Sequence, residues 1–240
     1  MRSRYGRSAG AGHVAVVSRK VAQGVRPTSP WALTGEQLRS CLDRLGHGVA
    51  TLDVKAELHS YLRGARETLV WKLDGLSEYD IRRPLTPTGT NLLGLVKHST
   101  FTHVGYFGDV FGRNTDASLA RLSGGAGPAA EFWATPDESR QDIVTNYRDA
   151  WKLSDATITE LPLDAVGQVW WWGDATVTLH HVLVHVTADT QRHAGHADIV
   201  RELIDGSVGM LKGVDNLHIR DPAEQERFRD QVEAAAAEFQ

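Results

Sequence analysis

The hydrophobic residues between Val177 and Glu202 recur at alternating steps of four and three, the spacing of one buried face of an α-helix. This face is apolar except at Thr190 and His193. Steps of four, four and three place four residues that can bind a metal on one side of the predicted helix: His185, Asp189, His193 and His196. The pattern fits a metal site inside a helical bundle, and it also fits one buried histidine with solvated neighbours.

Three other segments carry the same periodicity, and each begins at a residue that can cap a helix. The candidate caps are Asp53, Asn91 and Thr135, with Thr178 opening the segment described above. The predicted helices span residues 53–76, 91–111, 135–161 and 178–203. Four long amphipathic segments joined by medium-length connectors predict an all-α four-helix bundle. The connectors at 81–90 and 163–174 have room for short extended segments, but no sheet is expected.

The remaining chain predicts extensions on both sides of the bundle. Residues 1–30 are rich in Gly, Ser and Arg without any period, which indicates a loosely attached extension. Residues 31–50 contain a capping box, Thr34 with Gln37, and predict a short N-terminal helix that ends at Gly46. We expect the bundle domain at 51–212 and a C-terminal helical tail at 213–240, whose helix starts at Asp221 and Pro222.

Composition narrows the classes of function. A formal net charge of -4 over 240 residues gives no basic surface for nucleic acid. No apolar run is long enough to span a membrane, so no membrane partner is expected. Cys41 is the single cysteine, which rules out a disulfide within the chain and predicts a reducing, cytoplasmic location.

Candidate chemistry lies on two of the predicted helices. His98 is on the inward side of the second helix, and Asp189 and His193 are one turn apart on the fourth. Three ligands with an open fourth position are typical of catalytic zinc rather than structural zinc. His185 is an alternative to Asp189, and His196 either packs or hydrogen-bonds to a ligand.

The tryptophan run in the last connector has two interpretations. Trp171 and Trp172 either cover the open end of the bundle or form the aromatic wall of a ligand pocket.

Two sequence blocks resemble the signature blocks of a known superfamily. They are TPTGTNLLGLVKHSTFTHVGYFGDVFG and VTLHHVLVHVTADTQRHAGHADIVRELIDG. Both resemble the DinB-like superfamily, and within it the mini-circle protein branch, which is related to the metal-binding domains of mycothiol-dependent maleylpyruvate isomerases. The resemblance covers about Lys55 to Gly209.

The resemblance implies an up-down-down-up four-helix bundle, here with an extra N-terminal helix and a C-terminal helix. It also implies a three-ligand metal site, with His98 on helix two and Asp189-x-x-x-His193 where relatives carry Glu-x-x-x-His or His-x-x-x-His. The side chain of Asp189 is one methylene shorter than the glutamate that some relatives carry at this position. His103 stands where relatives commonly carry an acid, and it is a further candidate near the site. Zinc is the expected metal, and nickel or iron would also suit these ligands.

The function implied is a metal-dependent enzyme that activates a low-molecular-weight thiol such as mycothiol for S-transfer or isomerisation of a small-molecule substrate. Metal-activated water would instead make the protein a hydrolase. A non-enzymatic stress protein that binds a metal or a ligand is the third interpretation, because a fold does not establish chemistry. A homodimer remains open.

Overall fold

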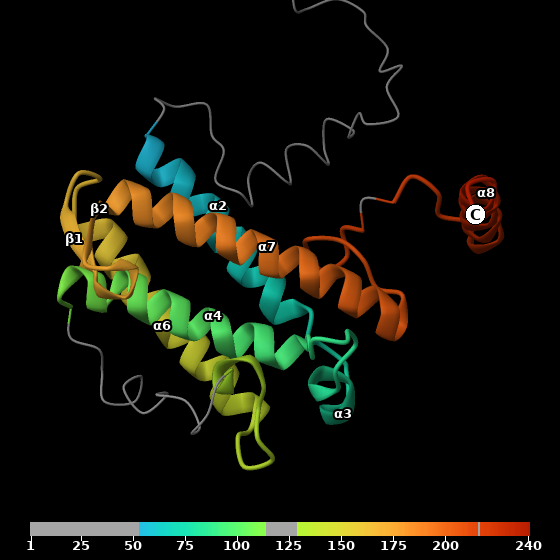
Figure 1. The fold of residues 1–240 in the computed structure, drawn as a ribbon, viewed down its shortest axis with the longest axis horizontal. Coiled ribbons are helices and arrows are strands. Elements are labelled where there is room, and N and C mark those ends of the chain that lie inside the picture. Colours follow the sequence, from blue (N-terminus) through green and yellow to red (C-terminus); the bar gives the residue numbers. More distant parts are fainter. Residues whose placement is uncertain (1–52, 114–128, 216) are drawn as a thin grey trace, which may run out of the picture. The chain divides into compact units, whose positions relative to one another are not determined.

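The computed structural model describes residues 53–113, 129–215 and 217–240, in which the secondary-structure elements are helices apart from one short hairpin (Figure 1). The predicted extension at 1–30 and the predicted helix at 31–50 lie outside the described residues. The α-helices are α2 (Val54–Trp71), α3 (Glu78–Arg82), α4 (Leu92–Phe107), α6 (Arg140–Glu160), α7 (Leu179–Asp205) and α8 (Pro222–Ala237). The 3-10 helices are η1 (Asp109–Phe111), η2 (Ala130–Phe132) and η3 (Trp170–Trp172), and the strands are β1 (Val166–Val169) and β2 (Ala175–Thr178).

The helix starts follow the capping residues in all but one case. Asp53, Asn91, Thr178 and Asp221 each accept a hydrogen bond from a backbone N–H of the first turn, as predicted. The start of α6 was predicted wrongly, because its cap is Ser139 rather than Thr135. The Glu138 carboxylate, three residues after Thr135, accepts a hydrogen bond from the Thr135 backbone N–H as in a capping box, but it also pairs with Lys97 and closes a turn ahead of the helix.

Hydrogen bonds at the helix ends define the topology. Lys55 at the start of α2 donates to the carbonyl of Leu161 just after α6, so these two helices are antiparallel. Thr157 near the end of α6 donates to the carbonyl of Phe107 at the end of α4, so α4 and α6 are parallel. Arg201 near the end of α7 donates to carbonyls at the end of α2, so α2 and α7 are also parallel. The order is therefore up-down-down-up, as the resemblance implies.

The packing divides the bundle into two helix pairs. Helix α2 packs most extensively on α7, and α4 on α6, while α4 and α7 share a smaller interface. Two buried clusters fill the bundle rather than one continuous layer. Leu69 of α2 and Leu73 just after it lie in the first, with Ala194 and Val200 of α7. The second contains Leu62, Leu179, Leu183 and Val186.

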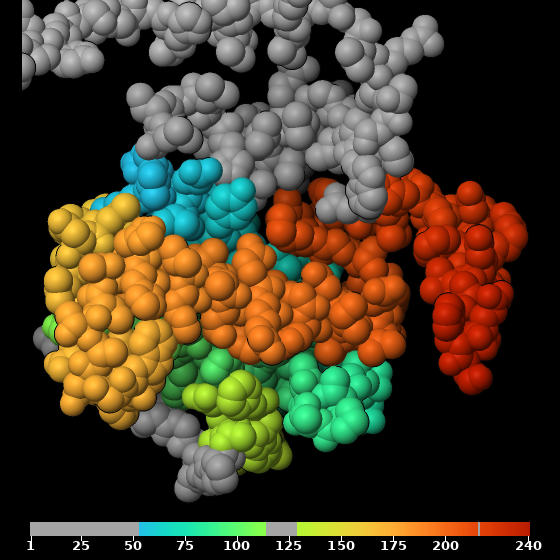
Figure 2. All heavy atoms as spheres, turned by 45° about the horizontal axis from the view of Figure 1, so that its top comes forward, coloured from blue at the N-terminus to red at the C-terminus, as the bar shows by residue number. Residues whose placement is uncertain are grey.

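A two-stranded antiparallel hairpin precedes α7 and corrects the expectation that no sheet would form. Its register pairs Val166 with Thr178 and Val169 with Ala175. Each strand has only four residues, too few for a period of two to stand out in the sequence. Figure 1 shows the hairpin leading into α7, and in Figure 2 the yellow atoms of this region lie against the orange atoms of α7. The hairpin carries the three tryptophans of η3 beside the first turns of α7.

The C-terminal helix does not contribute to the core. Helix α8 begins at the predicted cap but buries none of its residues. None of the helices in the described ranges has the length and apolar character that crossing a bilayer requires.

Candidate metal site

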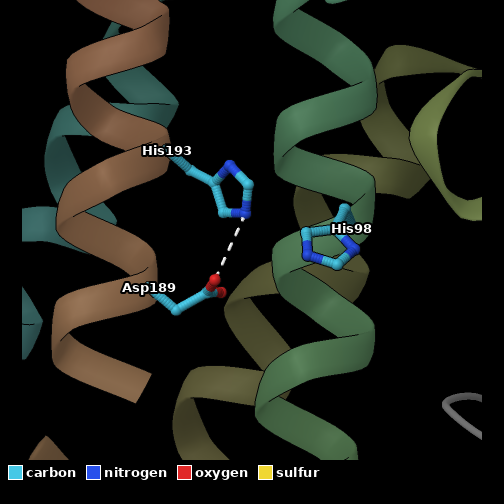
Figure 3. Close-up of side chains that lie close together, drawn as sticks. All are labelled: His98, Asp189 and His193. Atoms are coloured by element: carbon cyan, nitrogen blue, oxygen red, sulfur yellow. Dashed lines mark ion pairs between the residues drawn. The ribbon is translucent and has the colours of Figure 1, made fainter. Parts of the chain in front are cut away.

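His98, Asp189 and His193 lie together, with one ligand atom from each residue within 4.8 Å of the other two (Figure 3). The Nε2 atom of His193 is 3.5 Å from a carboxylate oxygen of Asp189. The rings of His98 and His193 meet edge to face, with centroids 4.9 Å apart. The structure thus brings together the three residues that the sequence analysis selected. Whether they bind a metal stays a prediction.

The placement of the three side chains follows from helix geometry. Asp189 and His193 are four residues apart on α7 and point to the same side. His98 comes from α4, which runs antiparallel to α7 and contacts it. The exposed fractions of the side chains are 17% for His98, 29% for Asp189 and 13% for His193, so all three are partly buried and remain in contact with solvent.

The electrostatics favour an ionised carboxylate. Burial raises the pKa of Asp189, but the hydrogen bond from His193 and the nearby histidines outweigh burial and hold this pKa below its usual value. Asp189 is therefore ionised at neutral pH and offers an anionic oxygen at the cluster. On the other side of the His193 ring, Nδ1 is buried and has no hydrogen-bond partner among the described residues.

The donor set fits a divalent transition metal. Zinc bonds to imidazole nitrogen and carboxylate oxygen are about 2.0–2.2 Å long, which puts neighbouring ligands of a tetrahedral ion roughly 3.5 Å apart. Since the three ligand atoms already lie within 4.8 Å, small side-chain rotations are enough to close the site around an ion. Two imidazoles and one carboxylate leave a fourth position for a small molecule.

Glu131 and Phe132 of η2 hold His98 from the side away from α7. The Oε1 atom of Glu131 is 3.2 Å from Nδ1 of His98, and the Phe132 ring stacks on the imidazole with centroids 4.2 Å apart. Figure 3 shows the other ring nitrogen of His98 facing the α7 pair. The sequence analysis missed both residues, because η2 lies in a connector without periodicity and its contact with α4 is long-range.

The other candidate residues occupy different surroundings. The ring of His185 lies beside Tyr106 and Trp172, with centroids 4.9 Å and 4.8 Å away, and His185 is not part of the three-residue cluster. His196 is exposed, with its ring centroid 5.6 Å from that of His193. It is therefore a neighbour of a candidate ligand.

His103 lies fully buried in the bundle rather than at the site. Its Nδ1 atom is 3.0 Å from the hydroxyl of Ser154 and 3.3 Å from the guanidinium of Arg66. His103 is therefore not part of the three-residue cluster.

Trp171 and Trp172 form an aromatic group with a residue that the sequence analysis did not select. The ring centroids of Trp171 and Trp172 are 5.1 Å and 5.5 Å from that of Tyr106 on α4. The signal for Tyr106 is present in the sequence: it follows His98 by eight residues, close to two helical turns, and so faces the same side of α4.

The up-down-down-up bundle, with His98 on α4 and the Asp189–His193 pair on α7, has the arrangement that the resemblance to DinB-like proteins implies. Residues 57–206, more than half of the chain, match the family model described as Mycothiol-S-transferase, and the chain belongs to this family. The matched segment contains all three residues of the cluster. No curated protein matches the chain.

Proposed function

We propose that this protein is a metal-dependent S-transferase that activates mycothiol or a similar low-molecular-weight thiol and joins its sulfur to a small electrophile. The convergence of His98, Asp189 and His193 within 4.8 Å, inside the segment that matches the Mycothiol-S-transferase family, carries the proposal. Zinc is the expected ion, and nickel or iron would also be accepted. A divalent cation with an open position lowers the pKa of a bound thiol and so supplies thiolate at neutral pH.

The residues of the chain have separate parts in this scheme. His98, Asp189 and His193 would hold the ion, and the partial exposure of their side chains leaves room for a cosubstrate. Glu131 would fix the orientation of His98 through its contact with Nδ1. The exposed indoles of Trp171 and Trp172 would contact the electrophile.

The first test measures metal per chain by elemental analysis after dialysis against a weak chelator. We expect His98→Ala and His193→Ala to abolish stoichiometric metal, and Asp189→Glu to retain it because the carboxylate remains. His185→Ala serves as the matched control, since it removes a neighbouring histidine that lies outside the cluster. If His185→Ala emptied the site while Asp189→Ala did not, the ligand set would be His98, His185 and His193.

The second test concerns the thiol. In the cobalt-substituted protein, mycothiol should produce a new sulfur-to-cobalt absorption band in the near ultraviolet, and a thiol-free sugar should not. Consumption of an electrophile together with mycothiol would then identify the transfer reaction. A cobalt spectrum that no thiol changes would contradict the proposal and favour a hydrolase that uses metal-activated water.

A further inference from the structure

Tyr106 lies close to the candidate metal site along the interface of α4 and α7. Its ring centroid is 4.9 Å from that of His185. His185 is one turn before Asp189 on α7, a rise of about 6 Å along the helix axis. Burial raises the pKa of Tyr106, the hydrogen bond from Trp171 partly offsets this rise, and the charge of Asp189 adds a smaller rise. The phenol therefore packs against a residue that lies one helical turn from the candidate ligand Asp189.

The hydrogen-bonding state of Tyr106 leaves its proton available. The indole Nε1 of Trp171 lies 3.4 Å from the Tyr106 oxygen, and an indole N–H can only donate. The phenol oxygen is thus the acceptor in this contact. Among the described residues, none accepts a hydrogen bond from the Tyr106 hydroxyl. A hydroxyl that accepts from an N–H is polarised and becomes a better donor itself.

The aromatic side chains around the Tyr106 hydroxyl are partly exposed to solvent. Trp171 and Trp172 are each 36% exposed although their rings pack on Tyr106. The ring of Trp172 also meets His185 edge to face. Clustered, partly exposed aromatic side chains beside a polar group are typical of a ligand site, in which the rings contact the apolar part of the ligand and the polar group orients it.

We infer that Tyr106 is a catalytic residue whose O–H donates a hydrogen bond to the oxygen of the electrophile. This inference rests on the proposed function. It implies that the preferred substrates are aromatic α,β-unsaturated carbonyl compounds. The apolar part of the substrate lies against Trp171 and Trp172. The carbonyl oxygen faces Tyr106, and the β-carbon faces the thiol sulfur.

The reaction is an addition without a leaving group. The thiolate sulfur forms a bond to the β-carbon, the π electrons of the C=C bond shift toward the carbonyl, and the oxygen becomes an enolate. The Tyr106 O–H stabilises this oxygen by a hydrogen bond, as donors in an oxyanion hole do. A proton from water then reaches the α-carbon, so the net change is addition of S–H across C=C. An alkyl halide, in contrast, loses halide and develops no oxyanion, and so needs no such donor.

The experiment compares two phenyl-bearing electrophiles, benzylideneacetone and benzyl bromide, with mycothiol and the full-length metal-loaded protein. Removal of one oxyanion donor costs about 100- to 1,000-fold in kcat in buried sites, and Tyr106 is only half-buried, so we expect Tyr106→Phe to lower kcat for benzylideneacetone by about 10- to 100-fold. The rate with benzyl bromide should stay within about twofold. Tyr79→Phe, which removes a hydroxyl from a highly exposed tyrosine, is the matched control and should change neither rate. Equal losses with both electrophiles, or no loss with benzylideneacetone, would overturn the role of Tyr106.

A binding measurement on the metal-free protein separates this role from the transfer reaction. Para-nitrophenolate carries a stable oxyanion, and its binding can be followed by quenching of tryptophan fluorescence. We expect Tyr106→Phe to weaken this binding by about 10-fold and to leave the binding of nitrobenzene unchanged. A wild-type protein inert toward both electrophiles would contradict the proposed transferase, whereas equal affinities of wild type and Tyr106→Phe for para-nitrophenolate would overturn the oxyanion donor itself.

Discussion

The Glu131–His98 contact makes a sharp prediction about metal affinity. A metal-ligating histidine usually donates its second ring N–H to a carboxylate or carbonyl, and loss of that partner costs about 10- to 100-fold in affinity. Glu131 is positioned for this role, with Oε1 3.2 Å from Nδ1 of His98, but its side chain is 38% exposed. Because solvent screens this exposed carboxylate, we expect Glu131→Gln to lower the metal affinity by the smaller end of that range, about 10-fold. This corresponds to about 1.4 kcal/mol in binding free energy.

The assay is competition for zinc with a chromophoric chelator at fixed pH and ionic strength. The matched control is Asp137→Asn, which removes the same charge from an exposed residue in the same connector. If both variants weakened zinc binding equally, the effect would be one of net charge and the orienting role of Glu131 would be refuted. An unchanged affinity for Glu131→Gln would refute it as well.

Three further predictions concern stability. Leu69 is 1% exposed in the core, so Leu69→Ala should lower the free energy of unfolding in urea by roughly 2–5 kcal/mol, whereas Leu203→Ala at a 66% exposed position should change it by less than about 0.5 kcal/mol. Burial, and then the charge of Arg66, hold the pKa of His103 well below 6.5, so the folded state excludes a proton that the unfolded chain binds. Stability should therefore fall as pH falls from about 7 to 5, and His103→Gln should reduce this slope by up to about 1.4 kcal/mol per pH unit; parallel slopes would contradict the argument. A chain that begins at Pro30 should unfold at the same temperature and bind the same metal as the full chain, and insoluble expression would show that residues 1–29 are needed.

Local signals in the sequence were sufficient to predict most of the bundle. A helix start depends on one side chain and the N–H groups two or three residues later, so Asp53, Asn91 and Thr178 could be found without the fold. The grouping of Asp189 with His193 follows from helical spacing, and the pairing with His98 needed only the assumption that the two helices face each other. The start of α6 was missed because Thr135 and Glu138 do make the expected contact, but in a turn that precedes the helix.

Long-range contacts could not be predicted in the same way. Glu131 reaches His98 across 33 positions of the chain, and nothing in its own neighbourhood indicates this contact. The four-residue strands of the hairpin are stabilised by each other and by packing on η1, where a Cβ on Gly167 would come within 2.6 Å of Val110. The placement of His103 likewise depends on Arg66, which lies on another helix.

The division of the bundle into two helix pairs has a mechanical consequence. One candidate ligand belongs to the α4–α6 pair and two belong to the α2–α7 pair, so an ion held by all three would join the pairs across their smaller interface. Such an ion would cross-link the two helix pairs, because separating the pairs would require breaking bonds between the ion and its ligands. Metal binding and packing of the two pairs would then be coupled: the ion would stabilise the packed bundle by an amount that grows with the logarithm of its affinity, and a change that loosens the contact between α4 and α7 would weaken ion binding.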